Sequence, residues 1–243
     1  MNLLNQVAIV TGGAVRLGRE IALALAREGV DVCVHYGRST AAADETAAEI
    51  RALGQKAVTV SADLREPVVA ARAAFDAVCA EWGRVDLLIN CAAVFEAGTL
   101  AGTTEDQWDL HFDVNLKAPL FMCSEFAARL EPGRRGHILN IVDWRATRPV
   151  PGHLAYTLTK SALVAMTRVL AQELAPRMQV NAVAPGAILP PPGEDAAYLE
   201  AIAKDIPLGR VGAPEDVTRA ILYLLKSDFV TGEVIHVTGG QEL

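Results

Sequence analysis

The sequence predicts an α/β domain in which helices cover both faces of a doubly wound parallel sheet. Short apolar runs alternate with longer amphipathic stretches along the chain, a pattern typical of parallel strands buried on both faces. The 243 residues are 51% hydrophobic, and no change in composition marks a linker. We therefore expect a single domain over residues 1–243, with about seven strands.

Each predicted strand is a run of aliphatic and β-branched residues, and each predicted helix carries an apolar face. The strands are expected at residues 7–11, 30–36, 56–61, 86–90, 136–142, 178–184 and 233–237. The helices are expected at residues 16–28, 40–53, 67–82, 104–130, 154–175 and 214–225, with a short one near 195–203. Such sheets bind ligands at the carboxyl ends of their strands, so functional residues should follow strands.

Composition excludes several classes of protein. The net charge of −7 argues against nucleic-acid binding, for which a basic face supplies most of the affinity. The apolar runs are too short to cross a bilayer, and the first residues do not resemble a signal peptide. The four cysteines are widely spaced without a CxxC pair, which indicates reduced thiols in a cytoplasmic protein with no metal site.

The turn after the first strand, from Thr11 to Gly18, is rich in glycine and leads into a helix. Glycines at this place let the backbone approach a pyrophosphate, which the amino end of the helix attracts. The spacing is not GxGxxG, and a tight turn without any ligand would have the same glycines. The turn alone is therefore a weak indication of a dinucleotide site.

The end of the second strand indicates which dinucleotide is preferred. Domains that prefer NAD usually carry an acidic residue there for the ribose 2′-hydroxyl, whereas this chain has His35, Tyr36, Arg38 and Ser39. Arg38 and Ser39, with His35 or Tyr36 nearby, suit a 2′-phosphate, which favours NADP, although Arg38 would also be unremarkable as a solvated loop cation.

Tyr156 and Lys160 are four residues apart in the predicted helix 154–175, so they share a face. A lysine beside a phenol lowers the pKa of the phenol, which would make Tyr156 a proton donor and acceptor near neutral pH. An ordinary exposed pair would show the same spacing. The pair follows the predicted strand 136–142 at the expected ligand edge, which favours a catalytic role.

With these motifs the chain resembles the short-chain dehydrogenase/reductase family, from about Asn5 to the carboxyl terminus. The matching residues are Thr11, Gly12, Gly18, Asp63, the run Asn90-Cys91-Ala92-Ala93, Asn115, Tyr156, Lys160, Pro185 and Gly186. The resemblance implies a Rossmann-type fold in which Tyr156 donates a proton, Lys160 binds the nicotinamide ribose and Asn115 holds a water next to Lys160. The residues expected to contact the cofactor are Gly12, Arg16, Leu17, Gly18, His35, Tyr36, Arg38, Ser39, Asp63, Leu64, Asn90, Ala92, Lys160, Pro185, Gly186 and Ile188.

Two positions depart from the family pattern. Asp143 stands where the family has a serine that binds a substrate carbonyl oxygen, and an ionised Asp143 would repel an oxyanion. Either Asp143 is protonated, or the substrate presents N–H groups and a basic ring nitrogen. Arg16 replaces the middle glycine of the glycine-rich turn, and its side chain points either into the active site or into solvent.

Both departures resemble the branch of pteridine reductases and dihydromonapterin reductases, in which an aromatic residue at the place of Phe95 stacks on the pterin. This likeness implies transfer of hydride from NADPH to a dihydropterin, with Asp143, Tyr156 and Lys160 relaying the proton. Arg16, Phe95, Asp143 and Tyr156 are then the expected substrate contacts, although Phe95 would also serve as a core or lid residue. Family membership also implies a homotetramer.

Two other functions stay open at the level of sequence. The first is a short-chain carbonyl reductase, for example of a 3-oxoacyl thioester, in which Asp143 is protonated. The second is a catalytically silent NADP-binding protein, which the retained Tyr156, Lys160 and Asn115 disfavour. The segment from Ala187 to Pro192, followed by Gly193, Glu194 and Asp195, is expected to be a loop that its prolines stiffen, and the family resemblance implies that it closes over the substrate.

Overall fold

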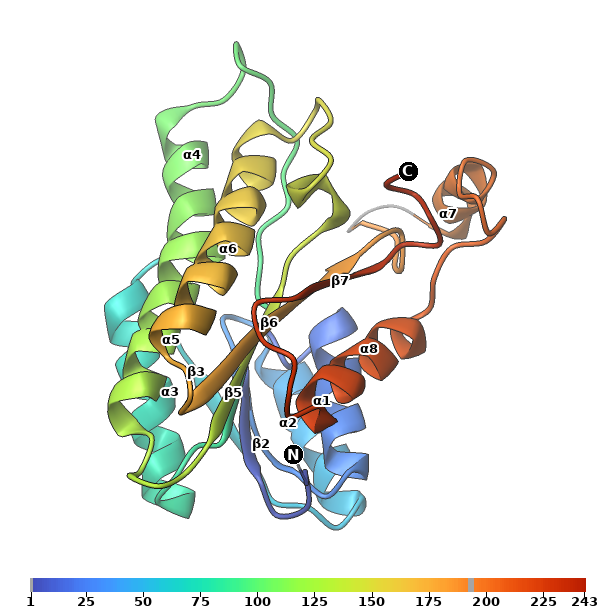
Figure 1. Ribbon diagram of the computed structural model, residues 1–243. Coiled ribbons are helices and arrows are strands. Elements are labelled where there is room, and N and C mark those ends of the chain that lie inside the picture. Colours follow the sequence, from blue (N-terminus) through green and yellow to red (C-terminus); the bar gives the residue numbers. More distant parts are fainter. Residues whose placement is uncertain (1, 192–194) are drawn as a thin grey trace.

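The computed structural model describes residues 2–191 and 195–243, which form one parallel sheet between two layers of helices (Figure 1). The strands are β1 (Val7–Val10), β2 (Asp31–Tyr36), β3 (Ala57–Ser61), β4 (Leu87–Asn90), β5 (Gly136–Ile141), β6 (Met178–Pro185) and β7 (Val234–Val237). Their order in the sheet is β3-β2-β1-β4-β5-β6-β7. The order reverses at β1, so the crevice between the turns after β1 and β4 is the switch point at which such sheets bind ligands.

The helices divide between the two faces of the sheet. They are α1 (Arg16–Arg27), α2 (Thr40–Ala52), α3 (Pro67–Trp82), α4 (Glu105–Phe112), α5 (Ala118–Arg129), α6 (Leu154–Glu173), α7 (Ala196–Ala203) and α8 (Pro214–Lys226), with the short segments η1 (Asp113–Lys117) and η2 (Trp144–Ala146). Figure 1 shows α1, α2 and α8 on one face and α3, α4, α5 and α6 on the other. Within the described residues, no helix is long and apolar enough to cross a membrane.

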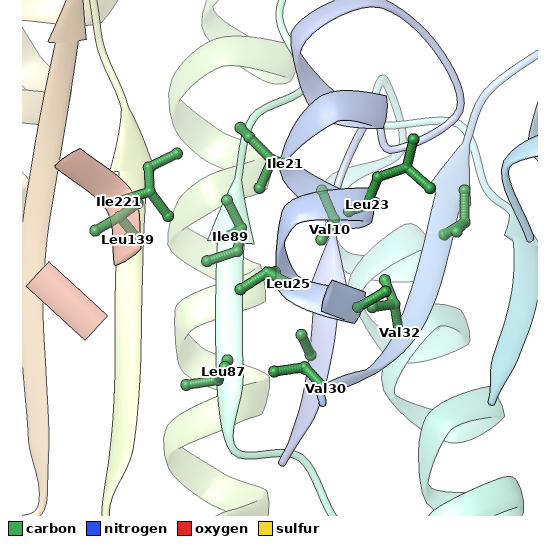
Figure 2. Packing of buried hydrophobic residues seen from close by; sticks show 14 of the residues in the cluster. Val10, Ile21, Leu23, Leu25, Val30, Val32, Leu87, Ile89, Leu139 and Ile221 are labelled. Atoms are coloured by element: carbon green, nitrogen blue, oxygen red, sulfur yellow. The ribbon is translucent and has the colours of Figure 1, made fainter. Parts of the chain in front are cut away.

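The sheet is held by aliphatic packing on both faces. Figure 2 shows Ile21 and Leu25 of α1 beside Val10 and Ile89 of the sheet, with Ile221 of α8 near the strand β5. All five side chains are almost completely buried. Burial of one such side chain stabilises a fold by roughly 1.5–3 kcal/mol, so this layer fixes α1, and with it the turn that precedes α1.

The predicted elements are confirmed, with one informative difference. Each strand lies within one residue of its prediction, and the helices lie within two residues of theirs, apart from the stretch 104–130. That stretch is α4 and α5 joined by the π-helical turn η1. Pro119 has no amide hydrogen and therefore cannot donate to the carbonyl of Asn115 as an α-helix requires, which is the local reason for the wider turn.

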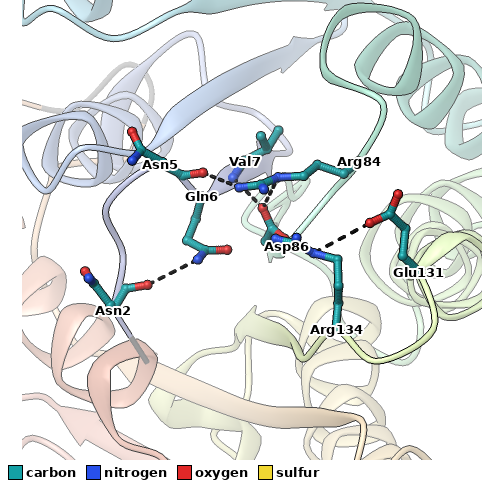
Figure 3. A network of polar contacts seen from close by, with 8 residues as sticks. All are labelled: Asn2, Asn5, Gln6, Val7, Arg84, Asp86, Glu131 and Arg134. Carbon is teal, nitrogen blue, oxygen red and sulfur yellow. Dashed lines mark hydrogen bonds and ion pairs between the residues drawn. The ribbon is translucent and has the colours of Figure 1, made fainter.

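A buried ion-pair network ties the amino ends of the strands together, opposite the ligand edge (Figure 3). The side chain of Asp86 is completely buried and lies 2.6 Å from Arg134 Nη2 and 3.1 Å from Arg84 Nε. Its Oδ2 also accepts the amide N–H of Val7 at 2.9 Å. Asp86 thereby joins the start of β1 to the segments that precede β4 and β5.

We predict that Asp86→Ala lowers the free energy of unfolding by about 3 kcal/mol, because it removes one partner of a buried ion pair. Asp76→Ala is the matched control, since Asp76 binds Arg129 at 2.7 Å while 67% of its side chain is exposed. The control should lose less than about 1 kcal/mol. Urea unfolding followed by circular dichroism measures both, and equal losses would contradict the structural role of Asp86.

Candidate active site

A cavity of about 460 Å³ opens at the carboxyl ends of β1, β4, β5 and β6. Twelve of the residues predicted from the sequence line it: Gly12, Arg16, Leu17, Gly18, Ala92, Phe95, Asp143, Tyr156, Lys160, Pro185, Gly186 and Ile188. The other predicted residues lie outside its lining: His35, Tyr36, Arg38, Ser39, Asp63, Leu64, Asn90 and Asn115. The cavity therefore collects the substrate candidates and three of the four catalytic candidates, whereas Asn115 and the expected 2′-phosphate contacts lie beyond its lining.

The turn between β1 and α1 is built for close approach of a ligand. Gly12 has a φ of +65°, and a Cβ atom on Gly18 would lie only 2.1 Å from the carbonyl oxygen of Gly12. Val15, the residue before α1, makes no side-chain capping hydrogen bond, and the first turn of α1 contains no acidic residue. The amide groups at this helix end therefore suit an anion, so the residues present fit the pyrophosphate of a dinucleotide.

His35 does not present a nitrogen to a phosphate, contrary to the expectation from the sequence. Its ring is buried, with Nε2 3.1 Å from the carbonyl of Ala62 and Nδ1 accepting the N–H of Gly12 at 3.4 Å. Burial lowers the pKa of His35 to about 4, so the ring is neutral at pH 7. The side chain lies behind the glycine turn and supports Gly12.

The other residues expected at a 2′-phosphate lie near the end of β2. Arg38 and Ser39 are exposed, and Arg38 is close enough to Asp63 to contribute to the lowered pKa of that carboxyl, whose main cause is its hydrogen bond with Arg65. Asp63 accepts from Arg65 Nε at 2.8 Å, so Arg65 already satisfies the Asp63 carboxylate.

The catalytic candidates come together on the cavity wall formed by β5 and α6. Tyr156 donates its hydroxyl hydrogen to Asp143 Oδ2 at 3.0 Å, and Lys160 donates to the carbonyl of Ile141 at 2.7 Å. Lys160 is only 2% exposed, and burial lowers its pKa to about 8. Asp143 also accepts the amide N–H of Arg145 at 2.8 Å, so the donors around it suit a carboxylate anion.

The expected effect on the Tyr156 pKa is wrong in this structure. Burial, followed by the charge of Asp143, raises the pKa of Tyr156 well above its ordinary value. The ammonium of Lys160 lies 5.8 Å from the centre of the phenol ring and binds the Ile141 carbonyl, so it does not offset these two effects. The Tyr156 hydroxyl is therefore protonated near neutral pH.

Asn115 and Asn90 serve the site by holding backbone segments. Asn115 accepts the N–H of Val94 at 2.8 Å and donates to the carbonyl of the same residue at 2.9 Å, which fixes the segment after β4. Asn90 donates to Asn140 Oδ1 at 2.9 Å and thereby links β4 to β5. Both side chains are buried, so they act from behind the cavity wall.

Phe95 stands at the mouth of the cavity inside a group of rings. It stacks on His153 with a centroid distance of 4.2 Å and meets the edge of Tyr156 at 4.7 Å. The Arg145 guanidinium lies 5.6 Å from the centre of the Phe95 ring. The place of Phe95 in the cavity lining agrees with the sequence expectation, while His153 and Arg145 were not predicted.

Arg16 lines the cavity and is also exposed to solvent, so the structure does not separate the two expected directions. Its Nη2 donates to the carbonyl of Pro190 at 2.6 Å, in the segment after β6. Arg16 begins α1 with a φ of +53°. The expected loop over the substrate continues into Pro192, Gly193 and Glu194, which lie outside the described residues.

Sequence reasoning missed several residues of the lining. These are Arg145, Tyr198, Leu199, Ile202 and Gln241. Gln241 accepts the N–H of Ala187 at 2.9 Å and so fixes the segment after β6. Only Arg145 had a signal in the sequence, because it is two residues after Asp143; the others come from remote parts of the chain.

Comparison with known proteins identifies the family. The family model described as enoyl-(acyl carrier protein) reductase matches residues 13–242. An uncharacterised oxidoreductase from Methylorubrum extorquens is 38% identical, with 97% of each chain covered. A 3-oxoacyl-[acyl-carrier-protein] reductase FabG from Staphylococcus epidermidis is 32% identical, with 98% of this chain and 99% of the relative covered.

Among solved structures, FolM alternative dihydrofolate reductase 1 from Brucella canis, complexed with NADP, has a TM-score of 0.94 at 34% identity, with 99% of this chain and 95% of that chain covered. The fold, the site and these likenesses define a nicotinamide-dependent oxidoreductase. The chain belongs to the short-chain dehydrogenase/reductase family.

We predict that the stability of the protein falls between pH 6.5 and pH 4 through His35. The unfolded chain takes up a proton on His35 near pH 6.5, whereas the folded chain does so only near pH 4, so stability present above pH 6.5 is lost as the pH falls. The full loss is on the order of 3 kcal/mol. Urea unfolding across this pH range measures the free energy of unfolding. Its dependence on pH should be weaker in His35→Gln than in the wild type, and equal dependences would contradict the assignment to His35.

Proposed function

We propose that the protein is an NADPH-dependent pteridine reductase, which reduces a dihydropterin, or a related dihydrofolate, to the tetrahydro form. The observation that carries this proposal is the hydrogen bond between Tyr156 and Asp143, at 3.0 Å, in the place where the family has a serine. A carboxylate accepts the N–H groups of an amino-substituted nitrogen ring, which pterins present. The likeness to the Brucella dihydrofolate reductase supports the same substrate class.

The residues of the cavity divide the reaction between them. The Gly12–Gly18 turn, Pro185, Gly186 and Lys160 would hold the cofactor, which supplies the hydride. Tyr156 turns its one hydroxyl hydrogen from Asp143 Oδ2 to the ring nitrogen next to the reduced carbon, donates the proton there and is left as the phenolate. Asp143 holds the Tyr156 hydroxyl in place before this step and accepts substrate N–H groups, while Phe95 lines the cavity beside the ring.

A carbonyl reductase acting on a 3-oxoacyl thioester is the second candidate, favoured by the 32% identity to FabG from Staphylococcus epidermidis. Reduction of a carbonyl builds negative charge on oxygen, which needs a hydrogen-bond donor at the position of Asp143. Asp143 instead accepts from Tyr156, from the amide of Arg145 and from the Arg145 guanidinium. This donor set favours the carboxylate form and therefore the first candidate.

Exposed apolar side chains support the proposal that four copies of the chain associate. Trp108 of α4, Leu120 of α5, and Leu158 and Val169 of α6 are between 37% and 51% exposed. These helices lie together on one face of the sheet in Figure 1, and burial of such side chains favours association.

We predict that dihydropterins or dihydrofolate support faster NADPH oxidation than an acetoacetyl thioester when all are assayed in parallel. Absorbance at the NADPH band measures the rates. Pterin turnover no faster than thioester turnover would contradict the proposed function.

We predict that Tyr156→Phe lowers kcat by about a hundredfold or more while NADPH still binds, because only the proton donor is removed.

We predict that Arg38→Ala raises the Kd of NADPH about 10- to 100-fold and leaves the Kd of NADH within about twofold, because only NADPH carries the 2′-phosphate. Titration of NAD(P)H fluorescence measures both constants. Arg27→Ala, at the far end of α1, is the matched control and should change neither constant. Equal weakening of the two cofactors by Arg38→Ala would refute the 2′-phosphate assignment.

A further inference from the structure

Arg145 contacts the carboxylate of Asp143 with both its backbone and its side chain. The amide N–H of Arg145 donates to Asp143 Oδ1 at 2.8 Å, and Nη1 lies 3.4 Å from the same oxygen. The other oxygen, Oδ2, accepts the Tyr156 hydroxyl at 3.0 Å. The carboxylate is therefore held from two sides, with one oxygen committed to Arg145 and the other turned toward Tyr156.

The guanidinium of Arg145 lies over two aromatic rings. Its Cζ atom lies 4.7 Å from the centre of the Trp144 ring and 5.6 Å from the centre of the Phe95 ring. Trp144 is buried, and only 19% of the Arg145 side chain is exposed. A planar cation between rings loses little further freedom when it binds a carboxylate, so the ion pair to Asp143 is pre-organised.

The other charged groups near Asp143 have partners of their own. Lys160 faces the site from α6 but binds the Ile141 carbonyl, and Arg16 reaches from α1 to the Pro190 carbonyl. The Cys91 thiol on the β4 side is kept neutral because burial raises its pKa to about 11. In the part of the chain that the structure describes, Arg145 is the ion-pair partner found for Asp143.

We propose that Arg145 is a positioning residue of the active site, which fixes the Asp143 carboxylate so that Oδ2 holds the Tyr156 hydroxyl in place at the cavity wall. The inference rests on the proposed roles of Asp143 and Tyr156 and not on the identity of the substrate. The positive charge of Arg145 also acts on Tyr156 directly, since it opposes the rise in the Tyr156 pKa caused by burial and by Asp143. Arg145 thereby eases release of the proton.

The Arg145 Nε atom is buried and has no hydrogen-bond partner. If position 145 served only to fill the space beside the rings, an apolar side chain would do so without burying a polar group. The arginine instead leaves a buried N–H without a partner, which costs free energy. The arginine is therefore explained better by its contact with Asp143 than by packing.

The test compares Arg145→Gln, which removes the charge, with Arg145→Lys, which keeps it. Arg135→Gln is the matched control, because Arg135 is exposed and precedes β5 at the opposite edge of the sheet. The measurements are kcat, KM, the solvent deuterium isotope effect on kcat and the Kd of NADPH, with whichever acceptor the wild type reduces. Thermal unfolding confirms that each variant is folded.

Arg145→Gln should lower kcat about 10- to 100-fold, the range expected when a hydrogen bond to a charged group is lost. It should leave the Kd of NADPH within about twofold and should increase the solvent isotope effect, because proton transfer from Tyr156 becomes slower. Arg145→Lys should recover part of kcat, since a positive charge remains beside Asp143 and Tyr156. Arg135→Gln should match the wild type in all four measurements.

The proposal is overturned if Arg145→Gln keeps kcat within twofold of the wild type. It is also overturned if both Arg145 variants lose activity equally while the isotope effect is unchanged, since that pattern indicates a packing role alone. If the wild type reduces the thioester and not the dihydropterin, the proposed function fails. The same variants assayed with the thioester then still decide the role of Arg145.

Discussion

The parallel pairing of β1, β4, β5 and β6 is the constraint on which the whole site depends. Because the carboxyl ends of parallel strands meet at one edge, the turns after these four strands enclose one cavity. β5 ends two residues before Asp143, and the return through α6 brings Tyr156 back to within hydrogen-bond distance of it. Asp143 and Tyr156, which are 13 positions apart, are thus brought into contact by the register of the strands and not by local sequence.

The fold could be predicted almost completely from the sequence, because its signal is repeated along the chain. Continuous apolar runs such as Leu87–Asn90 have no stable alternative to a buried strand in this setting, and the helices between them carry clear apolar faces. The π-helical turn at Asp113–Lys117 was missed because periodicity describes a helical face and not the hydrogen-bond pattern within it. Pro119, in the middle of the predicted stretch 104–130, was the signal in the sequence for this turn, because a residue without an amide hydrogen interrupts the α-helical pattern.

The types of residue in the site could be predicted from the sequence, but the partners that their side chains contact could not. Spacing put Tyr156 and Lys160 on one helix face, yet it could not show that Lys160 is bound to the Ile141 carbonyl, which together with burial reverses the expected effect on the Tyr156 pKa. His35 was expected beside a 2′-phosphate at the end of the second strand, but its ring is buried and its Nδ1 accepts the N–H of Gly12, so it supports the glycine turn. Such outcomes depend on burial and on partners distant in sequence, which no local pattern records.

The charges of the cavity explain how an acidic chain can hold an anionic cofactor and a carboxylate in one place. The net charge of −7 describes the whole molecule, whereas Arg16, Lys160 and Arg145 bring positive charge to the cavity lining beside Asp143. Because the cavity has a low dielectric constant, the electrostatic potential there depends more on these nearby charges than on the distant surface charges, which solvent screens. The cations also differ in what they contact: Arg16 binds the Pro190 carbonyl, Lys160 lies 5.8 Å from the centre of the Tyr156 ring, and Arg145 lies against the Asp143 carboxylate. A neutral residue at position 145 would leave Asp143 as an uncompensated negative charge beside Tyr156, and the pKa of the Tyr156 hydroxyl would rise further.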